Sequence, residues 1–334
     1  MAHKISWTEK TWNPVTGCSK VSDGCRHCYA EKMAKRLAGR CGYPADEPFK
    51  VTFHADKLDQ PGKWRKPKMV FVCSMGDLFH KHVTEEQQDM VYAVMAATPR
   101  HTYQVLTKRP ENMAEYNDIT YDNREEAIGR QVLKLTAGYL PGLVELPLPN
   151  VWHGTSAENQ ECFDARTHWL LSTPSAVRFV SAEPLLGPID IGMSTATCDC
   201  CKRWPSRWVR LYRSAKSDMP GLTGNVVAAA NIYRAESNRH GALSVHTPDG
   251  GLLGIKPQEF ECLPGLNWVI VGAESIGGRP GRECKLEWVR DIRDQCKTAG
   301  VPLFIKQLHI DGKLVKDIDR FPDDLRIREY PEVK

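Results

Sequence analysis

Six short apolar runs, rich in β-branched residues, are the feature that most limits how this chain can fold. Each is five or six residues long and almost continuously apolar. This pattern is typical of strands that are buried on both faces of a parallel sheet. The predicted strands are Met69–Cys73, Thr102–Thr107, Val151–Thr155, Val177–Ser181, Trp268–Gly272 and Pro302–Lys306.

Segments with helical periodicity lie between these runs. One begins at Thr84, which can form a capping box with Gln87. Two others span Gln160–Leu171 and Leu286–Thr298, and Gly300 follows the second as a stop signal. Repeated strand–helix–strand units are right-handed. We therefore expect an α/β fold with a parallel sheet, either doubly wound or curled into a complete or partial barrel.

Polar residues follow the predicted strands at the point where each one ends. Active sites of parallel α/β folds lie at the carboxyl ends of the strands, so we expect a site there. The alternative is that these residues only cap the strands. The residues concerned are Ser74–Asp77, Lys108, Arg109, Ser156, Glu158, Ser181–Glu183, Glu274, Ser275, Lys306 and Gln307.

One long segment interrupts the alternation of strands and helices. Residues 191–266 are polar and rich in Gly, Ser, Arg and Asn, and they lie between two core strands. We predict that residues 1–190 and 267–334 form the core and that 191–266 are an insertion. Two further stretches, 41–67 and 116–150, are expected to be irregular because Pro and Gly recur in them.

The composition is that of a soluble globular chain that stays in the cytoplasm. No run of about 18 apolar residues is present, and the first residues lack the apolar region of a signal peptide. The net charge of +4 permits a nucleic-acid partner without requiring one. Two basic stretches contain Trp, residues 63–68 and 202–213, and they are either phosphate-binding or ordinary solvated surface.

Three of the 12 cysteines lie close together near the N-terminus. Cys18, Cys25 and Cys28 have the spacing C-x6-C-x2-C in a loop with Pro and Gly, directly before a predicted helix that starts with Tyr29. Thiolates are the usual ligands of iron–sulfur clusters. Three ligands leave one iron of a 4Fe–4S cluster open, and that iron can hold the amino and carboxylate groups of S-adenosylmethionine. Reduction of the cluster would then give a 5′-deoxyadenosyl radical.

Zinc is the main alternative for these cysteines. A structural zinc site needs four Cys or His ligands, and three cysteines are present. His27, His54, His80 or His82 would have to supply the fourth ligand. Three unrelated thiols are the remaining interpretation.

At these motifs the sequence resembles the radical S-adenosylmethionine superfamily, and more closely an uncharacterised family within it that phages and bacteria encode. The cysteine spacing departs from the common C-x3-C-x2-C, and His27 replaces the usual aromatic residue before the last cysteine. The segments that carry the resemblance are 12–31, 71–80, 104–110, 181–186, 271–275 and 304–307.

The resemblance implies a partial TIM-like barrel with the cluster loop after the first strand, and a flavodoxin- or ferredoxin-like electron donor. It implies that the turn containing Met75, Gly76 and Asp77 meets the methionine amino group of S-adenosylmethionine. Further contacts to that cofactor are expected from Tyr29, Lys108, Ser156 and Glu158. Catalytic or substrate-binding roles are expected of Glu183, Glu274, Lys306 and Gln307.

A second group of cysteines lies in the predicted insertion. It consists of Cys198, Cys200, Cys201 and Cys262, with His240 and His246 between them. These residues would bind zinc, hold an auxiliary iron–sulfur cluster, or form an unliganded loop.

Three functions are consistent with the sequence. The first is a radical enzyme that acts on a nucleic-acid base or nucleotide, in modification or repair. The second is a radical enzyme for a peptide or small metabolite. The third is a zinc-binding nucleic-acid module without catalytic activity.

Overall fold

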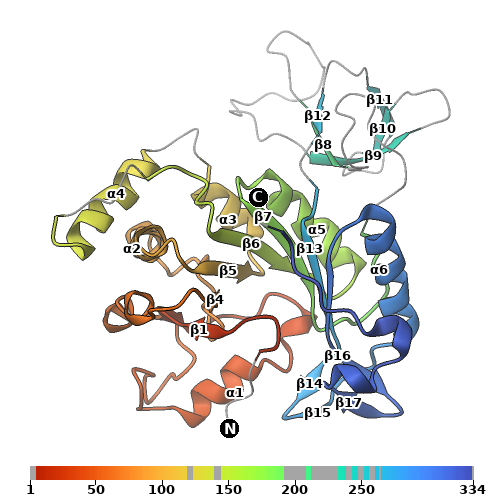
Figure 1. The fold of residues 1–334 in the computed structure, drawn as a ribbon, viewed down its shortest axis with the longest axis horizontal. Helices are drawn as coiled ribbons and strands as arrows, with labels where there is room; N and C mark the ends of the chain where they lie inside the picture. Colours follow the sequence, from red (N-terminus) through yellow and green to blue (C-terminus); the bar gives the residue numbers. More distant parts are fainter. Residues whose placement is uncertain are drawn as a thin grey trace.

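The computed structural model describes residues 5–118, 123–138, 144–191 and 265–332, and the backbone of five strands between 208 and 262. Its centre is an eight-stranded sheet in the order β1-β4-β5-β6-β7-β13-β16-β17 (Figure 1). The first seven strands are parallel, and β17 is antiparallel to β16. The bounds are β1 Lys10–Trp12, β4 Met69–Val72, β5 Thr102–Thr107, β6 Val151–Ser156, β7 Val177–Ala182, β13 Trp268–Gly272, β16 Leu303–Ile310 and β17 Lys313–Val315.

All six predicted strands are confirmed to within a few residues, and so is the α/β fold with a parallel sheet. The sequence did not indicate the two edge strands, β1 and β17, which have only three residues each. Strand β1 pairs with β4 through Trp12 and Val72 and lies directly before the cysteines. The loop that bears Cys18, Cys25 and Cys28 therefore follows the first strand, as the resemblance implies.

Aromatic side chains show that the sheet is curled. Trp7, just before β1, lies against Phe71 of β4 and Trp268 of β13, with ring centroids 4.6 and 6.3 Å away. Four strands separate β1 from β13 in the sheet order, which would place them about 24 Å apart in a flat sheet. The open, strongly curved sheet is consistent with a partial barrel, whose amino end these aromatic rings fill.

The helices of this structure are α1 Tyr29–Arg36, α2 Glu85–Ala97, α3 Pro110–Tyr116, α4 Arg124–Leu135, α5 Gln160–Ser172 and α6 Leu286–Ala299. Helices α2, α3, α5 and α6 share an apolar core with the outer face of this sheet, α4 packs against α2, and α1 packs on the turn after β4. The capping box of α2 forms between Thr84 and Gln87, and Gly300 ends α6 in the left-handed conformation. Alternate strand residues such as Val70 and Val72 face outwards and share one apolar core with Val91 of α2.

One stretch that was expected to be irregular contains a helix. Residues 116–150 include α4, which buries Ile128 and Val132. The prediction was wrong because only two apolar residues of this helix face inwards, which is too few to show helical periodicity. The surrounding residues are charged, and the sequence that follows is rich in Pro and Gly. Packing against α2, rather than a strong apolar stripe, stabilises this helix.

The remaining strands form smaller sheets. Between 208 and 262 lies a five-stranded antiparallel sheet in the order β11-β10-β9-β8-β12. Its strands are β8 Trp208–Leu211, β9 Ile232–Ser237, β10 Leu243–His246, β11 Leu252–Ile255 and β12 Phe260–Cys262. The division into core and insertion stays a prediction.

Two short two-stranded antiparallel sheets complete the strands: β2 Val15–Thr16 with β3 Thr52–Phe53, and the hairpin of β14 Ser275–Ile276 with β15 Arg279–Pro280. Single 3-10 turns occur at 23–25 (η1), 55–57 (η2), 61–63 (η3), 318–320 (η5) and 323–325 (η6). Among the described residues, no helix is both long and apolar enough to cross a membrane.

Candidate functional site

The loop that bears the three cysteines, residues 13–28 (the cysteine loop), begins against the turn after β4. Gly17 donates its N–H to the carbonyl oxygen of Met75 at 2.9 Å. Its φ is +83°, and a Cβ at this position would lie 2.1 Å from the carbonyl oxygen of Lys50. Both the backbone angle and the lack of space require glycine, so the residue before Cys18 is fixed tightly.

The guanidinium of Arg109, which follows β5, lies beside the first thiol. Its Nη1 donates to Cys18 Sγ at 3.3 Å and to Asp77 Oδ2 at 3.0 Å. Its Nη2 donates to both oxygens of Ser19 at 2.9 Å. Asp77 also accepts a hydrogen bond from Thr107 Oγ1 at 2.7 Å. Residues at the ends of β4 and β5 therefore hold the start of the cysteine loop.

Glu158, which follows β6, holds the middle of the cysteine loop. Its fully buried carboxylate accepts hydrogen bonds from the Ser22 hydroxyl, from Gly24 N–H at 3.1 Å, from Lys108 Nζ at 3.2 Å and from Arg166 at 2.8 Å. Burial alone would raise the pKa of Glu158, but the two cations and the hydrogen bonds outweigh it and lower the pKa to about 2. The carboxylate is therefore ionised at neutral pH.

Glu274, which follows β13, holds the end of the loop. It accepts a hydrogen bond from Arg282 Nη2 at 2.5 Å and contacts His27 Nδ1 at 3.2 Å. Arg282 also pairs with Asp23 at 2.5 Å. Burial opposes ionisation of Glu274, but the hydrogen bonds from Arg282 lower its pKa to about 2. The loop is thus attached to residues that follow four of the parallel strands.

The three thiols are half-buried. Burial and the nearby Asp77 raise the pKa of Cys18 to about 11, against the opposing effect of Arg109. Burial also opposes ionisation of Cys25, yet its pKa is lowered, because hydrogen bonds within the loop and the charge of Lys108 favour the thiolate. Two cations therefore lie close to the sulfur atoms that would become thiolate ligands.

Within the described residues, no three or more His, Cys, Asp or Glu side chains, the three cysteines included, are grouped in a way that would hold a metal ion. The histidines considered as a fourth zinc ligand have other neighbours: His27 contacts Glu274, His54 contacts Thr16 at 2.7 Å, His80 contacts Ser19 at 2.9 Å, and His82 packs against His80.

The turn after β4 packs beneath α1. Met75 is buried with Ala30 and Ala34 of that helix, and a Cβ on Gly76 would lie 3.0 Å from the backbone at Gly17. Tyr29 is 52% exposed, and its hydroxyl donates to the carbonyl oxygen of Ser74. The inner face of α1 is therefore formed by the two alanines, whereas the larger Tyr29 and Met33 are exposed.

The other predicted site residues lie at the ends of neighbouring strands. Lys306 and Glu183 form an ion pair between β16 and the residue after β7. Gln307 donates to the carbonyl oxygen of Ala273 at 2.6 Å, and the buried Ser156 presents its carbonyl oxygen to Arg166 at 2.8 Å. In the described structure these residues lie at the carboxyl end of the sheet, as the cysteines do, but none of them forms a hydrogen bond or an ion pair with a thiol.

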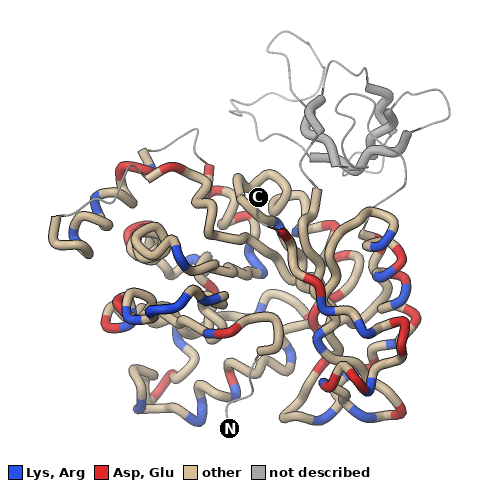
Figure 2. Tube along the Cα trace, viewed as in Figure 1, with Lys and Arg blue, Asp and Glu red and all other residues tan. Residues whose placement is uncertain are grey.

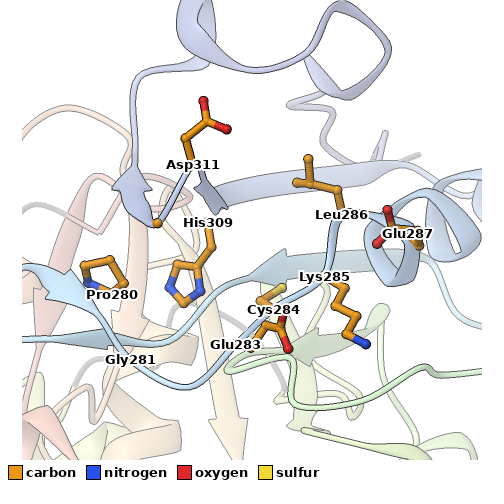
Figure 3. A pocket seen from close by; sticks show the side chains of 10 residues that line it. Pro280, Gly281, Glu283, Cys284, Lys285, Leu286, Glu287, His309 and Asp311 are labelled. Atoms are coloured by element: carbon orange, nitrogen blue, oxygen red, sulfur yellow. The ribbon is translucent and has the colours of Figure 1, made fainter.

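A pocket of about 560 Å³ lies between the β14–β15 hairpin, the start of α6 and the β16–β17 turn (Figure 3). Two of its lining residues contact the backbone of Glu274: His309 Nε2 and Gly281 N lie 2.9 and 3.0 Å from the Glu274 carbonyl oxygen. Glu274 therefore connects the wall of the pocket to the cysteine loop. The lining residues are Pro280, Gly281, Glu283, Cys284, Lys285, Leu286, Glu287, His309, Asp311 and Gly312.

Several predicted residues cannot be placed at the site. Cys198, Cys200 and Cys201 lie outside the described residues, as does most of the basic stretch 202–213. Cys262 ends β12, of which only the backbone is described. The other basic stretch, 63–68, precedes β4 and therefore lies at the amino end of the sheet, opposite the cysteine loop.

Sequence reasoning missed the arginines that organise the site. Arg166 and Arg282 were not candidates, and Arg109 was noted only as a residue at a strand end. Arg166 and Arg282 pair with Glu158 and Glu274, each eight residues earlier in the chain, and Arg109 pairs with Asp77, 32 residues earlier. Only Arg109 lies next to a predicted strand end, and that position does not identify its partner.

Fold and loop together define a class: an α/β protein with a curled, mostly parallel sheet and a thiol-bearing loop across the carboxyl ends of its strands. Residues 2–318 match a family model described as "Protein of unknown function (DUF5131)", and the chain belongs to this family. The family description assigns no radical S-adenosylmethionine activity. Comparisons with curated proteins and with solved structures found no match.

Proposed function

We propose that the protein is a radical S-adenosylmethionine enzyme whose Cys18, Cys25 and Cys28 hold a 4Fe–4S cluster. The observation that carries the proposal is the attachment of the cysteine loop to residues after β4, β5, β6 and β13. This places three half-buried thiols at the end of the sheet where parallel α/β folds have their active sites.

The residues present fit such a cluster. The donors are three thiols from one loop, and thiolates are the ligands that iron–sulfur clusters take. Arg109 and Lys108 would compensate part of their negative charge. When bound, the cluster would supply the electron that cleaves S-adenosylmethionine to a 5′-deoxyadenosyl radical.

The contacts change the role proposed for some residues. Glu158 accepts hydrogen bonds from the loop and pairs with Lys108, so we assign both residues to positioning the cysteines rather than to binding S-adenosylmethionine. The turn at Ser74–Asp77 lies against the residue before Cys18 and remains the proposed contact for the methionine amino group. Glu183 and Lys306, which are paired at the same sheet edge, remain proposed substrate or catalytic residues.

The substrate stays a prediction from the sequence. The basic stretch 63–68 lies at the opposite end of the sheet, so it adds no support for a nucleic-acid base or nucleotide at this site. Nucleic-acid retention and its dependence on salt would test that prediction separately.

Single substitutions of the cysteines test the proposal. After anaerobic reconstitution, the wild-type chain should contain about four irons and absorb visible light. Cys18→Ala, Cys25→Ala and Cys28→Ala should each lose most of the iron and the S-adenosylmethionine cleavage seen with dithionite. Cys41→Ala is the control, because Cys41 is exposed and outside the loop. Retention of the iron in all three loop variants, or a protein that binds only zinc, would exclude the proposal.

A further inference from the structure

One local excess of positive charge lies within the cysteine loop and directly after it. Residues 19–40 contain six Lys or Arg and two Asp or Glu, a net charge of +4 that equals the net charge of the whole chain. The rest of the chain therefore carries no net charge. Lys and Arg recur along α1 in Figure 2. A local excess of this kind attracts an acidic partner and orients its approach.

Half of these cations have no carboxylate partner within the part of the chain that the structure describes. Lys20 and Lys35 pair with Glu31, and Arg26 pairs with Asp23. Lys32, Arg36 and Arg40 are exposed and make no ion pair with a described residue. Their charges are therefore free to pair with another molecule.

Apolar side chains are exposed on the same segment. Of the seven large apolar residues that are exposed in the described structure, three are Val21 in the loop and Tyr29 and Met33 on α1. Tyr29 and Met33 are four residues apart and thus lie on one side of the helix. Tyr, Met and Arg are enriched at protein–protein interfaces, and Met adapts to varied partner surfaces.

We propose that this surface, formed by Lys20, Val21, Tyr29, Lys32, Met33 and Arg36, docks a small acidic electron-carrier protein. The inference rests on the proposed function, because the surface begins within the cysteine loop and continues directly from Cys28. One electron would pass from a reduced flavin of the partner to the oxidised cluster, so that the flavin is oxidised and the cluster is reduced.

A protein partner fits this surface better than a nucleic acid does. Single-stranded nucleic acids bind through aromatic side chains that stack on successive bases. Here one aromatic side chain is present, beside two aliphatic ones. Asp23 and Glu31 also lie among the cations and would repel phosphates.

Rapid-mixing kinetics of the reconstituted full-length protein test the docking surface. The probe is an acidic flavodoxin in its hydroquinone form, and the signal is bleaching of cluster absorbance. Lys32→Glu combined with Arg36→Glu should slow this reduction about tenfold at low salt. The effect should shrink as NaCl is added, because salt screens exposed charges. Reduction by dithionite should be unchanged.

The matched control reverses two exposed charges at the other end of the sheet. Arg65→Glu with Lys66→Glu makes the same change in net charge and should leave reduction by flavodoxin within about twofold of wild type. Equal effects of the two double variants, or a variant on α1 that reacts normally with flavodoxin but loses affinity for single-stranded DNA, would overturn the docking proposal. Failure of dithionite to reduce any cluster in the wild-type protein would instead refute the proposed function.

Discussion

At the residue scale, Glu158 is the side chain on which the cysteine loop depends most. It is fully buried and receives hydrogen bonds from the loop and from two cations. If the charge of Glu158 were removed, Lys108 and Arg166 would lose their counter-charge. Leaving a buried charge uncompensated costs more stability than the intact ion pair contributes. The same contacts fix the loop, so Glu158 links stability to the geometry of the thiols.

We predict that Glu158→Gln lowers the free energy of unfolding by about 2 to 3 kcal/mol. Urea denaturation at neutral pH measures this change. Glu161→Gln is the matched control, since Glu161 is exposed at the start of α5, and it should change stability by less than about 0.5 kcal/mol. Equal stability of the two variants would show that the Glu158 contacts do not form.

The same residue makes a prediction about pH. The folded pKa of about 2 lies below the ordinary 4.5, so the carboxylate stabilises the fold above the ordinary pKa, and this stability is lost as the pH falls towards 2. The stability difference between the wild-type protein and Glu158→Gln should therefore narrow as the pH falls from about 5 to about 3. Urea denaturation of both proteins at each pH measures it. A difference that widens on acidification would contradict the assigned ionisation.

Arg109 should affect the midpoint potential of the proposed cluster. Its Nη1 donates to Cys18 Sγ, and both hydrogen bonds to sulfur and nearby positive charge favour the reduced form of a cluster. We predict that Arg109→Gln lowers the midpoint potential by tens of millivolts, while Arg109→Lys retains more of it. Redox titration followed by electron paramagnetic resonance measures this. Arg26→Gln, in the same loop but exposed, should leave the potential unchanged.

At this scale the sequence predicted the three cysteines proposed as cluster ligands, but not the charged residues that surround them. The spacing of Cys18, Cys25 and Cys28 is local and can be recognised without a fold. The contacts of Glu158 with Gly24, and of Glu274 with His27, join residues that are 134 and 247 positions apart in the sequence. Such pairs depend on the register and curl of the sheet, which local patterns do not contain.

At the scale of elements, the buried strands were predictable because each is a short, continuous apolar run. Strands β1 and β17 and helices α3 and α4 were not predicted. The three residues of each strand are too few to show a pattern, and α4 has only a weak apolar stripe. Strand β1 pairs with β4 and helix α4 packs against α2, so tertiary contacts decide their structure.

The start of the cysteine loop depends on one glycine. Gly17→Ala would place a methyl group against the backbone of Lys50 and impose a strained φ. Gly138 has a similar φ of +93° but open space around it. We predict that Gly138→Ala costs about 1 kcal/mol of stability, whereas Gly17→Ala costs clearly more and also reduces iron incorporation. Chemical denaturation and iron analysis of both variants measure the difference. Equal costs would show that the close contact at Gly17 is absent.

At the scale of the whole molecule, the two ends of the curled sheet differ in chemistry. Aromatic rings around Trp7 and Trp268 fill the amino end. The carboxyl end carries the thiols, the ionised carboxylates and the arginines that pair with them. The sequence indicated this division through polar residues after each strand, but the closing of the barrel end by Trp7 required the three-dimensional structure.

The most direct test of the central claim is the electron paramagnetic resonance spectrum of the anaerobically reconstituted protein after reduction with dithionite. An open iron in a cluster held by three cysteines can bind S-adenosylmethionine. We predict the signal of a reduced 4Fe–4S cluster, with a spectrum that changes when S-adenosylmethionine is added. A protein with no cluster signal, or with a signal that S-adenosylmethionine leaves unaltered, would contradict the account.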